Sequence, residues 1–221
     1  MDIEANIREV KRRMARACER SRRSPDEITL VAVTKAFESQ AIRAAFDSGI
    51  RDFGENRVQE AEGKIAQLSD LRSSVTWHMV GHLQSNKAKI AVELFDIIHS
   101  VDSVNLAGIL SRRLDRPLPV LLEVNVSGEV TKVGFSLGEL VAAVKEIGQL
   151  PNLKLMGLMT VAPVAAEPEA VRPVFRKLRE LRDSLGLKHL SMGMTDDFEV
   201  AVEEGATMLR IGRAIFGERR Q

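Results

Sequence analysis

The chain has 221 residues, enough to bury a large core in a single domain, and its formal net charge is only +1. So balanced a charge gives no bulk attraction to nucleic acid or to an anionic membrane, and we expect a small-molecule partner instead. The lone cysteine, Cys18, excludes an internal disulfide framework and indicates a reducing, cytoplasmic compartment. The sequence contains no tyrosine, which excludes a phenol as general acid or base.

An amphipathic helix is predicted over Asp2–Arg20. Its apolar stripe has spacings of four, three, four and four and consists of Ile3, Ile7, Val10, Met14 and Cys18. The opposite face is rich in arginine, and a basic amphipathic helix can lie on a membrane surface. The stripe is thin and glutamates interrupt the positive face, which favours packing of this helix against a protein core. No apolar run is long enough for a membrane span or a secretory signal.

The rest of the chain repeats one pattern, in which a short apolar run is followed by a polar loop and then by a helical stretch. Eight runs are predicted as strands: Ile28–Val33, Arg51–Phe53, Thr76–Val80, Phe95–His99, Val120–Val126, Leu153–Met159, His189–Met192 and Met208–Ile211. Helices are predicted between them, including Ser39–Ser48, Val58–Leu68, Ser103–Leu114, Leu137–Gly148 and Val171–Leu185.

This alternation predicts one α/β domain over residues 1–221, folded as a parallel (β/α)8 TIM barrel with an additional N-terminal helix. An open doubly wound sheet is the alternative, because the runs at Arg51 and His189 are short. The stretch Ala162–Glu169 resembles a linker but falls where a loop between strand and helix is expected. In a barrel, polar residues after the strands gather at one mouth, so these residues have to be considered together.

Lys35 directly follows the first predicted strand. A single lysine in this position is commonly a rim amine whose aliphatic stem lies along apolar surface. The functional interpretation is a partly desolvated amine that attacks a carbonyl and forms a Schiff base. Such an amine would serve a class I aldolase or a protein that binds pyridoxal phosphate (PLP), and its position alone does not choose between them.

Two glycine-containing loops follow the seventh and eighth predicted strands, where this fold usually binds phosphate. Leu190–Phe198 offers hydroxyl groups and backbone N–H groups to an anion, and Leu209–Gly217 does the same beside Gly212. Tight turns alone would also explain the glycines. Arg210 lies within the last strand, so that either this arginine or its two apolar neighbours face the barrel interior. A buried arginine needs a partner, and one use is to donate to the ring nitrogen of PLP.

The other motifs are weaker. Glu55 or Asn56 is expected to cap the following helix. Glu123 and Asn125 are expected on one face of a strand, with Glu123 as a possible partner of Arg210. His78 and His82 are four residues apart, but they do not share a predicted helix and have no acidic ligand at helical spacing. We therefore predict no metal site.

Taken together, the motifs resemble the pyridoxal phosphate homeostasis protein family over nearly the whole chain. Six motifs in order carry the resemblance: LVAVTK, FGENRVQE, WHMVGHLQSNK, VNVSGEVTKVGF, GLMTVAP and LSMGMTDDFEVAVEEGATMLRIGRAIFG. The resemblance implies the barrel of the alanine racemase N-terminal domain type. It further implies PLP held as a Schiff base on Lys35, in a protein of intracellular vitamin B6 homeostasis or carriage without established turnover.

The same resemblance implies the residues around the cofactor. The phosphate is expected near Ser191, Gly193, Thr195, Gly212 and Arg213, with Arg210 facing the pyridine nitrogen and Asn56 near the ring. Arg57 stands where the family often has tyrosine, and Thr34 and Thr195 stand where serine is common. The threonines keep a hydroxyl group, so the expected phosphate contacts survive these changes.

Three functions remain open at this point. A PLP carrier that transiently meets PLP-dependent apo-enzymes is favoured. The first alternative is a racemase-like PLP enzyme acting on an amino acid, and the second is a class I aldolase. Alanine racemases use a second domain that contributes a tyrosine across a dimer. This sequence stops after the predicted barrel and has no tyrosine, so we expect a monomer and disfavour a two-base racemase.

Overall fold

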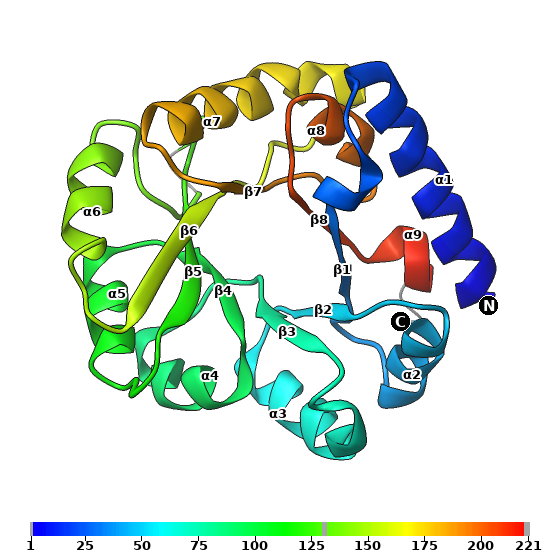
Figure 1. The fold of residues 1–221 in the computed structure, drawn as a ribbon, viewed down its shortest axis with the longest axis horizontal. Coiled ribbons are helices and arrows are strands. Elements are labelled where there is room, and N and C mark those ends of the chain that lie inside the picture. Colours follow the sequence, from blue (N-terminus) through cyan, green and yellow to red (C-terminus); the bar gives the residue numbers. More distant parts are fainter. Residues whose placement is uncertain (1, 130–131, 219–221) are drawn as a thin grey trace.

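The computed structural model describes residues 2–129 and 132–218, which form a closed barrel of eight parallel strands enclosed by helices (Figure 1). The strands pair in chain order and β8 closes the barrel against β1. Their bounds are β1 Thr29–Val33, β2 Asp52–Glu55, β3 Thr76–Met79, β4 Ile97–Val101, β5 Leu118–Glu123, β6 Leu153–Met159, β7 His189–Ser191 and β8 Met208–Ile211. The predicted (β/α)8 barrel is confirmed, and the open sheet is wrong.

The helices cover the outside of the barrel. Their bounds are α1 Ile3–Ser21, α2 Ser39–Asp47, α3 Val58–Gln67, α4 Ala88–Leu94, α5 Val104–Ser111, α6 Leu140–Ile147, α7 Arg172–Ser184, α8 Phe198–Glu203 and α9 Arg213–Phe216. Short 3₁₀ turns lie at η1 Pro25–Glu27, η2 Ser69–Leu71, η3 Ser85–Lys87 and η4 Pro168–Val171. None of the helices in the described part of the chain is long and apolar enough to cross a membrane.

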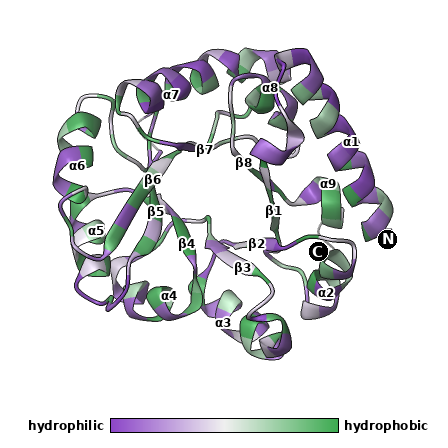
Figure 2. Cartoon of the chain, in the orientation of Figure 1, coloured by the Kyte–Doolittle hydropathy of each residue, from purple (hydrophilic) through white to green (hydrophobic). Residues whose placement is uncertain are grey.

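The N-terminal helix α1 packs on the outside of the barrel beside α8 and α9, as Figure 1 shows. It begins at a capped end, where the Asp2 carboxylate accepts a hydrogen bond from Ala5 N–H at 2.9 Å. Ile7, Val10 and Met14 of the predicted stripe are buried. The remaining faces of α1 and of α7 are largely hydrophilic (Figure 2). The helix therefore packs against the core, as its stripe predicts.

Some element boundaries differ from the sequence predictions. Phe95 ends helix α4 rather than beginning a strand, because its N–H still bonds to Ala91 O of the helix, and β4 starts two residues later. Helix α4 itself was not predicted. Strand β5 ends at Glu123, so Asn125 lies beyond the strand and does not share a strand face with Glu123, although both residues line one cavity. The Asn125 side chain instead bridges the following loop through a bond to Glu129 O at 2.8 Å.

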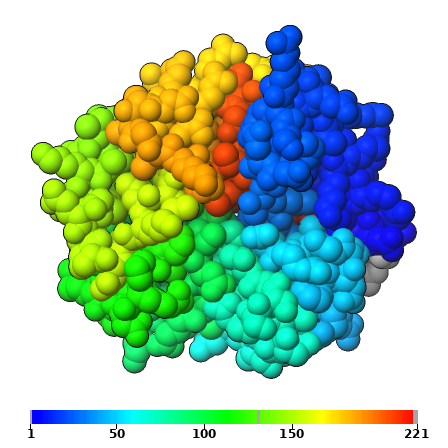
Figure 3. All heavy atoms as spheres, viewed as in Figure 1, coloured from blue at the N-terminus to red at the C-terminus, as the bar shows by residue number. Residues whose placement is uncertain are grey.

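The core has two parts. Large apolar side chains between strands and helices form one continuous cluster, which includes Phe53, Trp77 and Phe175. A second, small apolar cluster contains Leu121, Met159 and Met208. Figure 3 shows that atoms fill the centre of the molecule, although the ribbon appears open there. Strand alternation therefore separates a helix-facing layer from an interior layer.

Candidate active site at the carboxyl ends of the strands

Lys35 lies in a tight turn immediately after β1. Phe37 N–H donates to Thr34 O at 3.0 Å across this turn, and Thr34 N–H donates to Gly54 O of β2 at 2.9 Å. Ala36 has a positive φ of 64°, an unusual conformation for a residue other than glycine. The Lys35 side chain is half-buried. The turn is thus held to the neighbouring strand while Lys35 sits at its apex.

Buried charges lie directly behind this turn. Glu55 is completely buried and accepts hydrogen bonds from Lys64 Nζ at 2.7 Å and from the Thr34 hydroxyl. Burial raises the pKa of Glu55, while the Lys64 ammonium opposes that rise. The expectation that Glu55 or Asn56 caps α3 is wrong, because Arg57 occupies the cap position without a side-chain bond. The Glu55 side chain instead points toward helix α3, where it pairs with Lys64.

Arg210 points into the barrel from β8. Its neighbours Leu209 and Ile211 belong to the helix-facing core, which answers the question that strand alternation left open. The guanidinium donates to Ser191 Oγ at 2.6 Å and to Thr160 O at 2.8 Å. Burial lowers the pKa of Arg210 to about 10, and the negative charge of Glu123 opposes this shift. Arg210 therefore remains charged at neutral pH, and Glu123 acts on it through space.

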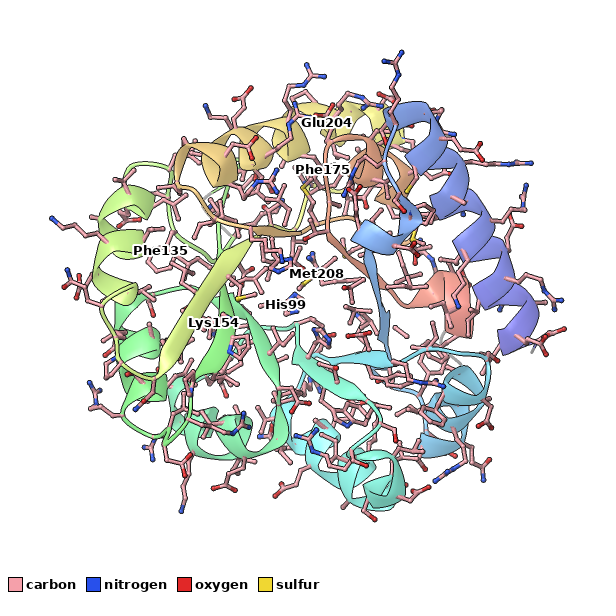
Figure 4. All side chains as sticks on the ribbon, in the orientation of Figure 1. His99, Phe135, Lys154, Phe175, Glu204 and Met208 are labelled. Atoms are coloured by element: carbon pink, nitrogen blue, oxygen red, sulfur yellow. The ribbon has the colours of Figure 1, made fainter. Side chains whose placement is uncertain are left out.

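A chain of hydrogen bonds crosses the barrel interior and ends at Arg210. Asp52 Oδ1 lies 3.0 Å from His78 Nε2, and His78 Nδ1 lies 2.9 Å from His99 Nε2. His99 Nδ1 in turn lies 2.7 Å from Ser191 Oγ. Figure 4 shows His99 near the barrel axis. Burial lowers the pKa of His99 well below its ordinary value, and the electrostatic interactions of this ring with His78 and Arg210 lower it further, so the His99 ring is neutral.

The loops after β7 and β8 are tied to each other. Ala214 N–H donates to Thr195 Oγ1 at 3.2 Å, and Gly193 O accepts from Arg210 N–H at 3.0 Å. Gly193 has a φ of 92°, and a Cβ atom there would lie 2.6 Å from Ala201 Cβ. Gly212 begins α9 and lies so close to β1 that a Cβ atom would be 3.3 Å from Val33 O. These contacts bring the two predicted phosphate loops next to the strand that leads to Lys35.

Two predicted phosphate ligands have other partners in the structure. The Ser191 hydroxyl lies inside the barrel between His99 and Arg210. Arg213 is half-exposed and forms an ion pair with Asp196 at the rim. A contact of either side chain with a phosphate stays a prediction.

Asn56 follows β2 and belongs to a polar cavity of about 740 Å³. Its Oδ1 atom is buried and accepts no hydrogen bond from the part of the chain that the structure describes. Other residues around the cavity include Arg57, His82 and Lys87. Gly81 permits a very close approach of two loops here, since a Cβ atom would be 2.4 Å from Asn56 O.

The two histidines considered as metal ligands have separate environments. His78 is buried in the interior chain, whereas His82 is exposed and lies 3.1 Å from Asp102. Over residues 2–129 and 132–218, no group of three His, Cys, Asp or Glu side chains is arranged to hold a metal ion.

The predicted site residues come together from four adjacent strands of the closed barrel, β7, β8, β1 and β2. The register aligns Val31 with Arg210 and Ala32 with Ile211, which places Lys35 and Gly212 at the same end of the barrel.

The sequence analysis did not predict the roles of His99 and Lys64. A signal for Lys64 was present, because this lysine lies on the same helix face as the buried Val58 and Ala61. The motif Val124–Phe135 includes residues 130 and 131, which lie outside the described part.

Comparisons with known proteins agree with this architecture. The family model for the alanine racemase N-terminal domain matches residues 2–220. A pyridoxal phosphate homeostasis protein of Pseudomonas aeruginosa is 46% identical over 222 residues, covering 98% of this chain and 96% of that protein. One from Aquifex aeolicus is 45% identical and covers 94% of each chain.

A solved structure gives the same result. The PipY protein of Synechococcus elongatus, determined with PLP bound, has a TM-score of 0.80 and 40% identity, covering 92% of this chain and 100% of that one. The full-length similarity and the barrel topology agree. The chain belongs to the pyridoxal phosphate homeostasis protein family, built on the alanine racemase N-terminal barrel.

Proposed function

We propose that this chain binds PLP through a Schiff base on Lys35 and serves as a carrier in intracellular vitamin B6 homeostasis. The observation that carries the proposal is the placement of Lys35 and the buried, charged Arg210 on two neighbouring strands, with the glycine loops beside them. The PLP-bound relative PipY supports the choice of cofactor. The buried Cys18 thiol, which forms no disulfide, supports a reducing compartment such as the cytosol.

The residues present fit this cofactor. Lys35 would hold the cofactor through its amine, with a C=N bond in place of the aldehyde C=O bond and the carbonyl oxygen released as water. Arg210 would donate to the pyridine nitrogen, and its retained proton would leave that nitrogen unprotonated, which weakens the ring as an electron sink. The unpartnered Asn56 Oδ1 and the paired loops at Gly193 and Gly212 offer further polar contacts near the ring and the phosphate.

Borohydride trapping tests the site directly. We expect the protein mixed with PLP to gain a visible absorbance that borohydride removes, and mass spectrometry of the reduced protein to find the cofactor mass on the Lys35 peptide. Lys35→Ala should lose this adduct, whereas the exposed Lys89→Ala should retain it. If Lys35→Ala keeps the same bound chromophore, the assignment of Lys35 is wrong.

A second experiment separates a carrier from an enzyme. A racemase-like enzyme would exchange the α-hydrogen of an amino acid with deuterated solvent faster than free PLP does. We expect no such exchange across a broad amino-acid panel. Exchange well above the free-PLP rate would overturn the carrier role and leave the cofactor site intact. An aldolase requires an unmodified amine, so a covalently bound aldehyde cofactor would exclude that alternative.

We further propose that the carrier is a monomer and meets PLP-dependent apo-enzymes only transiently. Sedimentation with and without PLP measures the first property. Adding an apo-enzyme to the loaded protein and following recovery of enzyme activity measures the second. A stable dimer or the absence of any transfer would overturn the respective part.

A further inference from the structure

We propose that Glu60 and Lys64 of helix α3 are positioning residues for Lys35, holding the two peptide groups on either side of it. The proposal rests on the proposed Schiff-base role of Lys35. It assigns a function to a buried ionic cluster of Glu55, Glu60 and Lys64 that does not itself carry the proposed chemistry.

The cluster contacts the backbone immediately before and immediately after Lys35. Lys64 Nζ donates to Thr34 O at 2.6 Å, and Glu60 Oε1 accepts from Ala36 N–H at 2.6 Å. Glu60 and Lys64 are one helical turn apart and are themselves joined at 2.6 Å. One helix face therefore grips both ends of the turn that carries Lys35.

The Lys64 ammonium has a fixed orientation. An ammonium group has three donors, and here they are matched by Thr34 O, Glu55 Oε1 and Glu60 Oε1, all within 2.7 Å. Only 9% of Lys64 is exposed, and Glu55 is fully buried, so water has little access to loosen these bonds. Hydrogen bonds to charged groups in such surroundings are stronger than neutral ones.

The turn needs this support because its backbone is strained. Ala36 adopts a φ of 64°, which costs about 1 kcal/mol or more for a residue with a Cβ atom. Without its partners, the turn would relax and move the Lys35 Cα atom. A nucleophile reacts efficiently only when it is held near the attacking geometry, so such a shift slows the covalent step.

The alternative is that the cluster serves stability alone, as many buried ion pairs do. Glu60 separates the two roles, because its side chain is 29% exposed while Glu55 and Lys64 form the buried pair. Replacing Glu60 removes the acceptor for Ala36 N–H and leaves the deeper pair in place. Glu62, an exposed residue of the same helix, provides a matched control.

The test measures PLP binding in two steps by rapid mixing, with the initial association constant and the rate constant for Schiff-base formation determined separately. We expect Glu60→Ala to slow the covalent step by about tenfold while association changes by less than about twofold. Glu60→Gln should recover most of the rate, because an amide oxygen can still accept from Ala36 N–H. Glu62→Ala should react like the unaltered protein.

Three results would overturn the proposal: equal covalent rates for Glu60→Ala and Glu62→Ala, equal slowing by Glu60→Ala and Glu60→Gln, or a loss confined to association. Lys64→Met is a second variant, with Lys64→Arg as its conservative partner, and both should be checked for folding by circular dichroism. We expect Arg to recover part of the rate that Met loses. If the unaltered protein gives no borohydride-trapped adduct on Lys35, the proposed function fails instead, which the same samples reveal.

Discussion

Ser191→Ala is the sharpest test of the hydrogen-bonded chain inside the barrel. The Ser191 hydroxyl accepts from the Arg210 guanidinium at 2.6 Å and lies 2.7 Å from His99 Nδ1. Removing it leaves a buried charged donor and a buried ring nitrogen each without that partner, while Arg210 keeps its bond to Thr160 O. An unsatisfied buried polar group costs about 1–3 kcal/mol, and more when it is charged. We therefore expect the free energy of unfolding to fall by about 3–5 kcal/mol.

Urea unfolding of the protein without PLP measures this loss. Thr160→Val is the matched comparison, because the Thr160 hydroxyl is also buried but makes a single bond, to Val124 O at 2.8 Å. That variant should lose only about 1 kcal/mol, the usual contribution of one neutral hydrogen bond. If Ser191→Ala loses no more than Thr160→Val, the hydroxyl does not hold the chain together. If Ser191 contacted only the phosphate, Ser191→Ala would lower the free energy of unfolding only when PLP is present.

Two further predictions concern the same barrel. The unfolded state protonates His99 near its ordinary pKa of 6.5, whereas the buried ring in the folded state resists protonation. The free energy of unfolding should therefore fall as pH drops below about 6.5, by up to about 1.4 kcal/mol per pH unit, and urea titrations of His99→Gln should show a shallower slope. An equal slope in both proteins would contradict this account. Gly193→Ala should destabilise by about 2–4 kcal/mol, because its Cβ atom would lie 2.6 Å from that of Ala201 at a positive φ. Thermal unfolding measures this effect, with Gly63→Ala as the control, because Gly63 lies in helix α3 with open space around it. The control change should be neutral or stabilise the protein by up to about 1 kcal/mol. Equal effects of the two changes would refute the steric argument.

The periodicity of apolar residues was sufficient to predict the strands and most helices, because a buried strand or helix face needs apolar side chains at fixed spacing. It was weaker at the ends of elements, where hydrogen bonds decide. Phe95 is as apolar as a strand residue, yet it completes α4. Helix α4 is only seven residues long, so its pattern repeats too few times to stand out.

Lys64 and His99 show why part of the site was not predicted. Each is a polar residue in a locally apolar pattern, and such a residue normally indicates either a partner or an exposed position. Lys64 pairs with Glu60 on the next helical turn, but its other partners, Glu55 and the Thr34 carbonyl, lie nine and 30 residues away. The partners of His99, His78 and Ser191, lie 21 and 92 residues away. Nothing in the local sequence indicates a pairing at such a separation.

The sequence by itself determined the barrel class and the family, since both follow from strand and helix periodicity and from motifs in a fixed order. It also pointed to Lys35, through the polar residues that follow the strands. Only the tertiary structure decided that Arg210 faces inward, that Ser191 joins it to His99, and that Glu60 and Lys64 hold the Lys35 turn. The physical reason is that closing the barrel brings distant strand ends together, and burial then requires each polar group to find a partner.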